Sequence, residues 1–435
     1  MLMRAAGIAL LLFVGSAFAQ GESTPEAAIR RVMDSATYKQ AVAALRRDHD
    51  RLVEENIRLT EIPAPPLKEQ AKGDAYLDML RQLAMTDAHM DAEGNVLGIR
   101  KGRGDGPLLA VVAHLDTVFA EGTDVKVKRD GNKLHAPGVA DDTRGLAVML
   151  ALIRAMDTAR VETESDILFV ASVGEEGLGN LRGMKHLFLE GPFKDKIKTF
   201  IALDGFNPAQ VTTTAMGSRR FRVTFSGPGG HSQLDFGTVN PMYAGGEFLV
   251  AFSRIPVPEL TTDNVGVVAG GTSVNAIAES VSMEVDIRSV TPDVIAELER
   301  RMREIAAAAV QAENNARSTK NGAIEVEIEV IGDRPAGSIQ DPLLGLRQPG
   351  NRARDRQLAQ LAWEAVIAHG FEPELRTLST DANIPMSLGV PAITIAAGVG
   401  DRAHSPDEWL DVDPEVSMRQ LGMAMTTILA AAGLR

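Results

Sequence analysis

The chain has 435 residues, of which 45% are hydrophobic and 24% charged, the composition of a soluble globular protein long enough for two domains. Its formal net charge of −13 argues against general binding to nucleic acid or to an anionic membrane surface. It contains no cysteine, which excludes disulfides, a thiolate nucleophile and cysteine-ligated metals, so any metal must be held by His, Asp and Glu.

The first residues resemble a secretory signal rather than part of the fold. Arg4 precedes an apolar run over residues 5–14, and Ala17-Phe18-Ala19 matches an A-x-A cleavage site. Because the run is too short to span a bilayer comfortably, we expect residues 1–19 to be removed, leaving a secreted or periplasmic chain without a membrane span. A retained N-terminal anchor is the alternative.

Strands and helices alternate along most of the chain. Helical spacing covers residues 25–59 and 73–83, on either side of a proline-rich break at 61–69, and a strong helix is predicted over 143–156. Short apolar runs predict strands over residues 108–113, 166–173, 200–203 and 390–396. Near-continuous apolar runs are typical of strands that are covered on both faces, so we predict an α/β fold with a mixed, largely parallel sheet.

The middle of the chain follows a different pattern. Residues 221–225 alternate between apolar and polar, and further segments predict a helix, two strands, a helix and a strand, over 241–254, 264–270, 280–289, 292–314 and 323–332. This β-α-β-β-α-β order predicts a compact α+β domain inserted into the first one. We therefore expect a discontinuous first domain, residues 26–217 and 336–435, interrupted by an inserted domain at residues 218–335.

Histidine and acidic side chains gather where the predicted strands end or the next helix begins: His114, Asp116, Asp141, Asp142, Glu175, Glu176, Asp204 and His404. Taken singly, each has an ordinary explanation, such as a hydrogen-bonded histidine, a helix cap or a solvated acidic turn. In open α/β sheets, however, ligands bind outside the carboxyl ends of the strands, and the fold brings these residues to that edge.

So many carboxylates in one cleft would repel one another unless a cation lay among them. Histidine with Asp and Glu and without sulfur suits Zn²⁺, with Co²⁺ or Mn²⁺ as alternatives. The sequence therefore predicts a centre for divalent metals.

Five motifs in order, "HLDTV", "GVADDTRG", "GEEG", "GGHS" and "AHSPDEW", resemble the co-catalytic zinc exopeptidase and amidohydrolase family. That family includes peptidase T, glutamate carboxypeptidase, acetylornithine deacetylase and succinyl-diaminopimelate desuccinylase. The resemblance runs from about residue 60 to the C-terminus and implies a two-metal catalytic domain interrupted by a lid that often forms a homodimer.

Carried over by motif position, the resemblance implies a role for each residue of the cleft. The implied metal ligands are His114, Asp141, Glu176, Asp204 and His404, with Asp141 bridging the two ions. Asp116 would hold the His114 ring, and in relatives the peptide bond after Asp141 is often cis. Glu175 would be the general base for a water held between the metals, and adjacent residues of an extended chain point opposite ways, as two such roles require.

The lid and a later loop supply further implied contacts. His231 in "GPGGHS" would stabilise the oxyanion, often in the active site of a partner subunit. Asn275 and Arg288 would hold a carboxylate or carbonyl group of the substrate, which suits the forked guanidinium of arginine. Asp381 and Asn383 in "STDANIP" would face the substrate, although a plain turn explains that stretch equally well.

Two departures from the family pattern bear on specificity. "DDTRG" stands where many relatives have Asp-Asp-Lys-Gly-Gly, and the third-strand acid is Asp204 rather than Glu, which resembles peptidase T and dipeptidases. We therefore expect an aminopeptidase or dipeptidase acting on small peptides. The alternatives are an N-acyl amino acid deacylase or carboxypeptidase of the same family, and an extracytoplasmic peptide-binding protein. A nucleotide-binding protein is disfavoured because no glycine-rich loop of that kind follows a strand.

Overall fold

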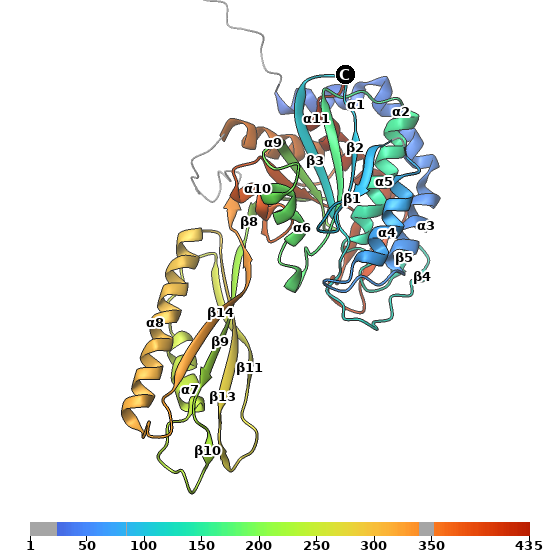
Figure 1. The fold of residues 1–435 in the computed structure, drawn as a ribbon. Coiled ribbons are helices and arrows are strands. Elements are labelled where there is room, and N and C mark those ends of the chain that lie inside the picture. The colour runs from blue at the N-terminus through green and yellow to red at the C-terminus, as the bar shows by residue number, and fades with distance from the viewer. Residues whose placement is uncertain (1–23, 84, 339–351) are drawn as a thin grey trace, which may run out of the picture.

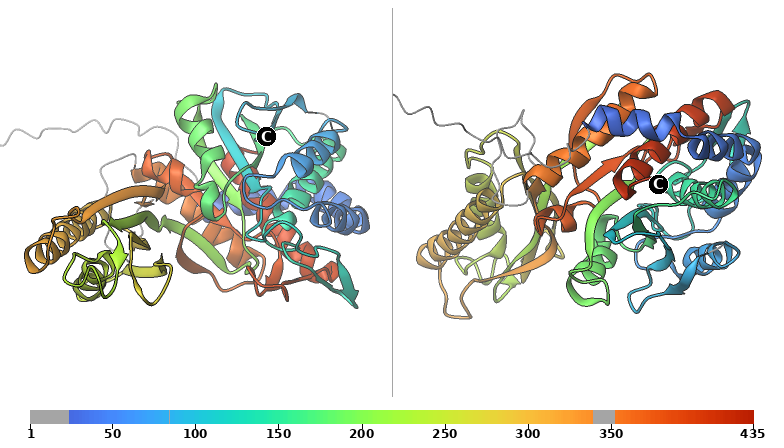
Figure 2. Two further views of the ribbon diagram at one scale, coloured as in Figure 1. Left: turned by 60° about the horizontal axis from the view of Figure 1, so that its bottom comes forward. Right: turned by 90° about the horizontal axis from the view of Figure 1, so that it is seen from above.

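The computed structural model describes residues 24–83, 85–338 and 352–435, so the expected signal peptide over residues 1–19 lies outside the described residues. The described chain folds into a larger lobe and an elongated smaller lobe that projects from it (Figures 1 and 2). Each lobe has its own sheet and its own hydrophobic core. No helix among the described residues combines the length and hydrophobicity that crossing a membrane requires.

The sheet of the larger lobe is mixed and has a parallel centre. Its strands run in the order β1-β2-β6-β3-β7-β17-β8-β15, with β16 paired to β8. Their bounds are β1 (Thr86–Met90), β2 (Val96–Arg100), β3 (Gly106–His114), β6 (Ser165–Ser172), β7 (Ile197–Leu203), β8 (Gln210–Ala215), β15 (Gly337–Ser338), β16 (Glu374–Leu378) and β17 (Ala392–Ile395). The predicted apolar strands are β3, β6, β7 and β17, and their mutual pairings are all parallel. The predicted mixed sheet is confirmed. Its central pairings are parallel, whereas the pairings β1-β2, β2-β6, β17-β8 and β8-β15 are antiparallel, so the sheet is less parallel than predicted.

Helices cover this sheet and explain why its central strands are mostly apolar. They are α1 (Pro25–Asp34), α2 (Ala36–Arg47), α3 (His49–Thr60), α4 (Gln70–Leu80), α5 (Thr143–Thr158), α6 (Arg182–Lys185), α9 (Arg352–Ala368), α10 (Asn383–Ser387) and α11 (Pro414–Ala432), with short turns η1 (Gly177–Gly179) and η2 (His186–Glu190). Helix α5 packs on β3 with one side and on α2 and α3 with another, so it is buried along most of its length. Helix α11 also contacts β3.

The N-terminal helical stretch is divided where capping residues interrupt it. Ser35 ends α1 and caps α2, because its hydroxyl accepts a hydrogen bond from the amide of Tyr38 at 3.1 Å. A further break at Asp48 separates α2 from α3.

The smaller lobe is the expected β-α-β-β-α-β unit. It consists of β9 (Gly217–Ser226), α7 (Pro241–Phe252), β11 (Thr261–Gly270), β13 (Ser280–Ser289), α8 (Pro292–Ala316) and β14 (Glu325–Arg334), with β10 (Gly230–His231) pairing β12 (Ala276–Ile277) at its tip. Its sheet is antiparallel, in the order β11-β13-β9-β14, and α7 and α8 cover one face (Figure 1). Phe221, Val223 and Phe225 point into its core, as their alternation predicted.

A small antiparallel sheet lies next to the carboxyl ends of the parallel strands of the larger lobe. Its strands are β4 (Lys128–Asp130), β5 (Lys133–His135), β18 (Val399–Asp401) and β19 (Trp409–Asp411), in the order β18-β19-β5-β4. This sheet joins the segment before α5 to the segment before α11. It thereby brings two loops that are more than two hundred residues apart in sequence to the carboxyl ends of the parallel strands.

Candidate metal centre

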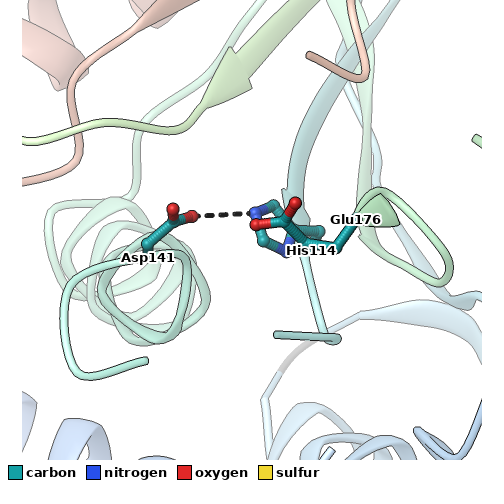
Figure 3. A group of neighbouring side chains, drawn as sticks. All are labelled: His114, Asp141 and Glu176. Atoms are coloured by element: carbon teal, nitrogen blue, oxygen red, sulfur yellow. Dashed lines mark hydrogen bonds and ion pairs between the residues drawn. The ribbon is translucent and has the colours of Figure 1, made fainter. Parts of the chain in front are cut away.

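The carboxyl ends of the central strands carry a cluster of ligand-type side chains. His114 is the last residue of β3, Glu176 follows β6, and Asp141 lies in the loop before α5. One ligand atom from each of the three lies within 4.8 Å of the others (Figure 3). Nε2 of His114 is 3.1 Å from Oδ1 of Asp141.

His404 joins this cluster from the loop between β18 and β19. Its Nε2 lies 2.9 Å from Oε1 of Glu176 and 3.2 Å from Oδ2 of Asp141. The two oxygens of the Asp141 carboxylate therefore each face a different histidine. A carboxylate flanked in this way is placed to bridge two metal ions.

Asp204 follows β7 and lines the same cavity as Asp141 and Glu176. Burial and the nearby negative charges of Asp141 and Glu176 raise the pKa of Asp204 to about 7. Hydrogen bonds with Asp141 and Glu176 raise the pKa of His404 to about 10. The neighbouring carboxylates Asp141 and Glu176 contribute to both shifts, which indicates a concentration of negative charge at this site.

This donor set fits divalent metal. Two imidazoles and three carboxylates converge without sulfur, a combination that suits Zn²⁺, Co²⁺ or Mn²⁺. The negative charge collected around Asp141 is what a pair of dications would neutralise.

Glu175 lies beside this cluster and is bound by an arginine. Its side chain is buried, and Oε1 lies 3.2 Å from Nη1 of Arg334. Burial raises the pKa of Glu175 well above its usual range, and the charge of Arg334 opposes that rise. A buried carboxyl group with a raised pKa is suited to exchanging a proton near neutral pH.

Asp116 positions the residues after β6. It is fully buried, and its carboxylate accepts hydrogen bonds from the amides of Glu175 and Glu176 at 3.0 and 2.8 Å. The ring of His114 is instead held mainly by the backbone carbonyl of Asp116, 2.9 Å from Nδ1, whereas the nearer carboxylate oxygen is 3.7 Å away. Asp116 therefore orients His114 through its main chain and the two glutamates through its side chain.

Asp142 and Glu408 hold the loop that carries Asp141. Asp142 caps α5, and its carboxylate accepts hydrogen bonds from the amides of His114 and Gly145 at 2.9 and 3.1 Å. The peptide bond between Asp141 and Asp142 is cis, as the resemblance implied. Glu408 is completely buried and accepts hydrogen bonds from the amides of Gly138, Ala140 and Asp141.

A buried lysine lies beneath these supporting carboxylates. Lys72 on α4 is 1% exposed, and its Nζ donates to Oγ1 of Thr143 at 3.4 Å. Burial lowers the pKa of Lys72 to about 8, while the charges of Asp116, Asp142 and Glu408 oppose that effect. Nothing local in the sequence marks Lys72. Glu408 lies within the "AHSPDEW" motif, but the motif does not show that its partners are Gly138, Ala140 and Asp141 in a distant segment.

The cluster opens into a cavity of about 560 Å³ between the two lobes. Asp141, Glu176, Asp204 and His404 form one part of its wall, and arginines form another: Arg220, Arg288 and Arg334. Nε of Arg288 lies 2.6 Å from Oδ2 of Asp286, which fixes the guanidinium at the lid side of the cavity. The cavity thus combines a metal-binding wall with a cationic wall.

Comparison with known proteins identifies the family. A model of the family described as peptidase family M20/M25/M40 matches residues 110–429, which is most of the chain. The chain belongs to this family.

Two relatives are distant in sequence but are matched over most of their length. The chain is 24% identical to the uncharacterized protein YqjE of Bacillus subtilis, over 86% of this chain and 97% of that protein. It is also 24% identical to acetylornithine deacetylase of Myxococcus xanthus, over 77% of this chain and 83% of that protein. The chain is therefore similar to enzymes of the metallopeptidase and amidohydrolase type, and its membership of the M20 family makes it a hydrolase of this type.

Solved structures show the same fold. Aminopeptidase PepT from Bacillus cereus superposes with a TM-score of 0.68 at 20% identity, covering 88% of this chain and 99% of that one. YxeP from Bacillus subtilis, described as a dinuclear metal-binding peptidase of the M20 family, superposes with a TM-score of 0.61 at 18% identity, covering 88% and 99%. A two-metal centre is therefore compatible with this M20 fold.

The loop expected to face the substrate lies deeper than predicted. Ser379 and Thr380 line the cavity, whereas Asp381 is buried behind them and accepts a hydrogen bond from Oγ of Ser172 at 2.5 Å. Burial raises the pKa of Asp381 to about 6.

Asn383 is also buried, and its side chain makes hydrogen bonds with the protein backbone. Its amide nitrogen donates to the carbonyls of Met216 and Pro335 at 2.9 and 3.0 Å, and its oxygen accepts from the amide of Thr380. Met216 and Pro335 adjoin the strands that lead into and out of the lid. Asn383 therefore anchors the lid connections and does not reach the cavity, contrary to the expected substrate contact.

Strand β10, which ends at His231, lies at the tip of the lid, the end farthest from the catalytic domain (Figure 1). Asn275 directly precedes β12, the strand that pairs with β10. His231 is exposed on β10, and the carbonyl of Asn275 accepts a hydrogen bond from the amide of Ser232 at 3.0 Å. Within one chain, the structure does not bring either residue to the metal centre. Arg288, in contrast, lines the cavity.

Proposed function

We propose that this M20 protein is a two-metal exopeptidase that cleaves an amide bond in small peptides, of the aminopeptidase or dipeptidase type. The observation that carries this proposal is the Asp141 carboxylate, whose two oxygens face His114 and His404 beside the buried Glu175. The fold shared with aminopeptidase PepT supports the choice of a peptide substrate.

We propose that the metal ligands are His114, Asp141, Glu176, Asp204 and His404. The ions would be zinc, with cobalt or manganese as alternatives. When bound, such ions lower the pKa of water and polarise the carbonyl group that is to be cleaved.

The remaining residues of the cavity bind and orient the substrate and move protons. Glu175 accepts a proton from the attacking water at its carboxylate and delivers it to the leaving amine. Asp116 fixes the backbone of Glu175 and Glu176, so the base and the neighbouring ligand keep their relative positions. Arg288 donates paired hydrogen bonds to a carboxylate of the substrate.

A second candidate function is hydrolysis of N-acyl amino acids or a carboxypeptidase reaction. The similarity to acetylornithine deacetylase over 77% of the chain favours it, and the same cavity would serve. The position of Arg288 suits the carboxylate of either substrate class.

We propose that His231 and Asn275 act on the catalytic centre of a partner subunit in a homodimer formed through the lid. Leu234, Phe236 and Val274 flank them and are almost fully exposed, at 82, 90 and 103%. Exposed apolar groups of this size favour burial against another surface. The proposed lid spans residues 218–335, between catalytic segments 26–217 and 336–435.

We propose further that residues 1–19 direct export and are then cleaved, giving a secreted or periplasmic enzyme. The support is the sequence alone, namely Arg4, the apolar run over residues 5–14 and the A-x-A site. Mass spectrometry of the N-terminus of the protein from its native host would test this.

A substrate panel tests the function. Free dipeptides and tripeptides would be compared with N-acetyl and N-succinyl amino acids, with zinc, cobalt or manganese added in turn. We expect cleavage of the peptides, and loss of cleavage on treatment with a chelator. Hydrolysis confined to the acyl amino acids would replace the peptidase assignment with the deacylase one.

A further inference from the structure

Two arginines, one from each strand that connects the lid to the catalytic domain, bind the turn at Glu175. Arg334 is the last residue of β14, and Arg220 lies near the start of β9. The turn they bind follows β6 and carries Glu175, Glu176 and Gly177. It therefore holds both the proposed base and a proposed metal ligand.

Arg334 contacts Glu175 through both the side chain and the main chain. Its Nη1 lies 3.2 Å from Oε1 of Glu175, and its Nη2 donates to the backbone carbonyl of Glu175. Nη1 is also 3.2 Å from Oγ of Ser379, which lines the cavity. Because the side chain of Arg334 is only 7% exposed, these contacts are largely shielded from water and salt.

Arg220 binds the other end of the turn. Its Nη1 donates to the carbonyl of Gly177 at 2.9 Å, and its Nε lies 3.5 Å from Oδ1 of Asp286 on β13. Arg220 thus links a strand in the middle of the lid sheet to the catalytic domain.

The returning strand makes further contacts with the segment after this turn. The amide of Asp333 donates to Oδ1 of Asn180 at 2.8 Å, and Nζ of Lys185 donates to the carbonyl of Asp333 at 2.7 Å. The turn itself is fixed from the catalytic side by Asp116, which accepts the amides of Glu175 and Glu176. The amides of Glu175 and Glu176 are therefore held by the catalytic domain, and the carbonyls of Glu175 and Gly177 are held by the lid strands.

We propose that Arg334 and Arg220 are positioning residues through which the lid strands hold the Glu175–Gly177 turn in the geometry that catalysis requires. This inference rests on the proposed role of Glu175 as the base. A change in lid orientation is transmitted to the turn because the carbonyl oxygens of Glu175 and Gly177 are bound by side chains that move with β14 and β9. Substrate binding at the lid and the placement of the base are thus coupled.

The test uses Arg334→Met, Arg334→Lys and Arg220→Met in the full-length, metal-loaded protein. Arg219→Met is the matched control, since Arg219 precedes Arg220 on β9 but pairs within the lid, with Nη1 2.6 Å from Oε2 of Glu299. Steady-state kinetics on the best peptide substrate would be combined with amide hydrogen exchange of the peptide covering residues 174–181.

We expect kcat of Arg334→Met to fall roughly 10- to 100-fold, the effect of losing hydrogen bonds to a charged group, with KM changed by less than about twofold. Arg334→Lys should recover part of kcat, and Arg220→Met should show a smaller loss. Exchange within residues 174–181 should accelerate in both methionine variants and stay unchanged in the Arg219→Met control.

Several outcomes would overturn the proposal. A raised KM with unchanged kcat would make Arg334 a substrate ligand instead, and equal effects in Arg219→Met would indicate a general loss of lid structure. If Arg334→Met does not fold, the proposal is tested by kcat, KM and amide exchange of residues 174–181 in Arg334→Lys and Arg220→Met. If no substrate is found, the proposed function fails on its own. Unchanged amide exchange in residues 174–181 of the methionine variants would still refute the positioning role of Arg334 and Arg220.

Discussion

Replacing Asp116 by asparagine tests whether the side chain that supports the two glutamates determines metal binding. Its two carboxylate oxygens accept one amide each, from Glu175 at 3.0 Å and Glu176 at 2.8 Å, and the residue is 0% exposed. Asparagine retains one acceptor oxygen but places an NH₂ group against the other amide. Asp116→Asn therefore weakens one hydrogen bond and leaves a buried N–H unpaired.

The magnitude follows from these two losses. Changing the acceptor from a charged to a neutral group costs about 1 kcal/mol, and an unsatisfied buried N–H costs about 1–3 kcal/mol. We expect Asp116→Asn to lower the free energy of unfolding of the chelator-treated protein by about 2–4 kcal/mol. Because Glu176 is then less firmly placed, metal affinity should fall about 10- to 100-fold, as for other residues that support a metal ligand.

Urea denaturation followed by circular dichroism measures the first quantity, and competition with a chelator measures the second. Asp124→Asn is the control, since Asp124 is exposed and its carboxylate accepts the amide of Lys126 at 3.0 Å. The control should change stability by less than about 0.5 kcal/mol. Wild-type stability and metal affinity in Asp116→Asn would refute the reasoning.

Other changes separate catalysis, pH dependence and lid attachment. Glu175→Ala should keep its metal ions by elemental analysis and lose about 10²- to 10⁴-fold in kcat, because it removes the proposed base; near-normal turnover would exclude that role. Burial and the charge of Arg419 lower the pKa of His369 to about 4, so the unfolded chain binds a proton between pH 6.5 and 4 that the folded chain does not. Stability should therefore fall by up to about 3 kcal/mol as the pH drops through that window, and His369→Gln should flatten the profile measured by urea titration. Asn383→Ala should lower the free energy of unfolding by about 2–4 kcal/mol, because it leaves the carbonyls of Met216 and Pro335 unpaired, without raising KM; a selective rise in KM would restore the substrate role first expected for Asn383.

The sequence predicted the parts of the site that the sheet itself organises. Each central strand ends in a near-continuous apolar run, so its carboxyl end is visible as the point where polar residues begin, as at His114, Asp204 and the pair Glu175-Glu176. Parallel strands in one sheet bring those ends together, which is why residues far apart in sequence could be grouped.

The supporting residues could not be predicted in this way. Lys72, Arg334 and Glu408 stand in polar stretches, where such side chains are exposed in most proteins. Their burial depends on contacts with segments more than fifty residues away, which no local periodicity records.

Hydrophobic periodicity also could not predict very short strands or the break between two helices. The strands of the small sheet, β4, β5, β18 and β19, have three residues each, too few for an alternating pattern to show. The break between α1 and α2 depends on a single serine, Ser35, in an otherwise helical stretch. Asn383 resembles a substrate-facing loop residue in sequence, and only the fold shows that its side chain is used by the lid connections.

The central claim is that His114, Asp141 and His404 assemble a two-metal centre, and the metal content of the protein tests it most directly. Elemental analysis of chelator-stripped protein reloaded with zinc should find two ions per chain in the wild type and fewer in His114→Ala and His404→Ala. A well-folded wild-type chain that binds no divalent ion, or histidine variants that keep the full content, would contradict the account.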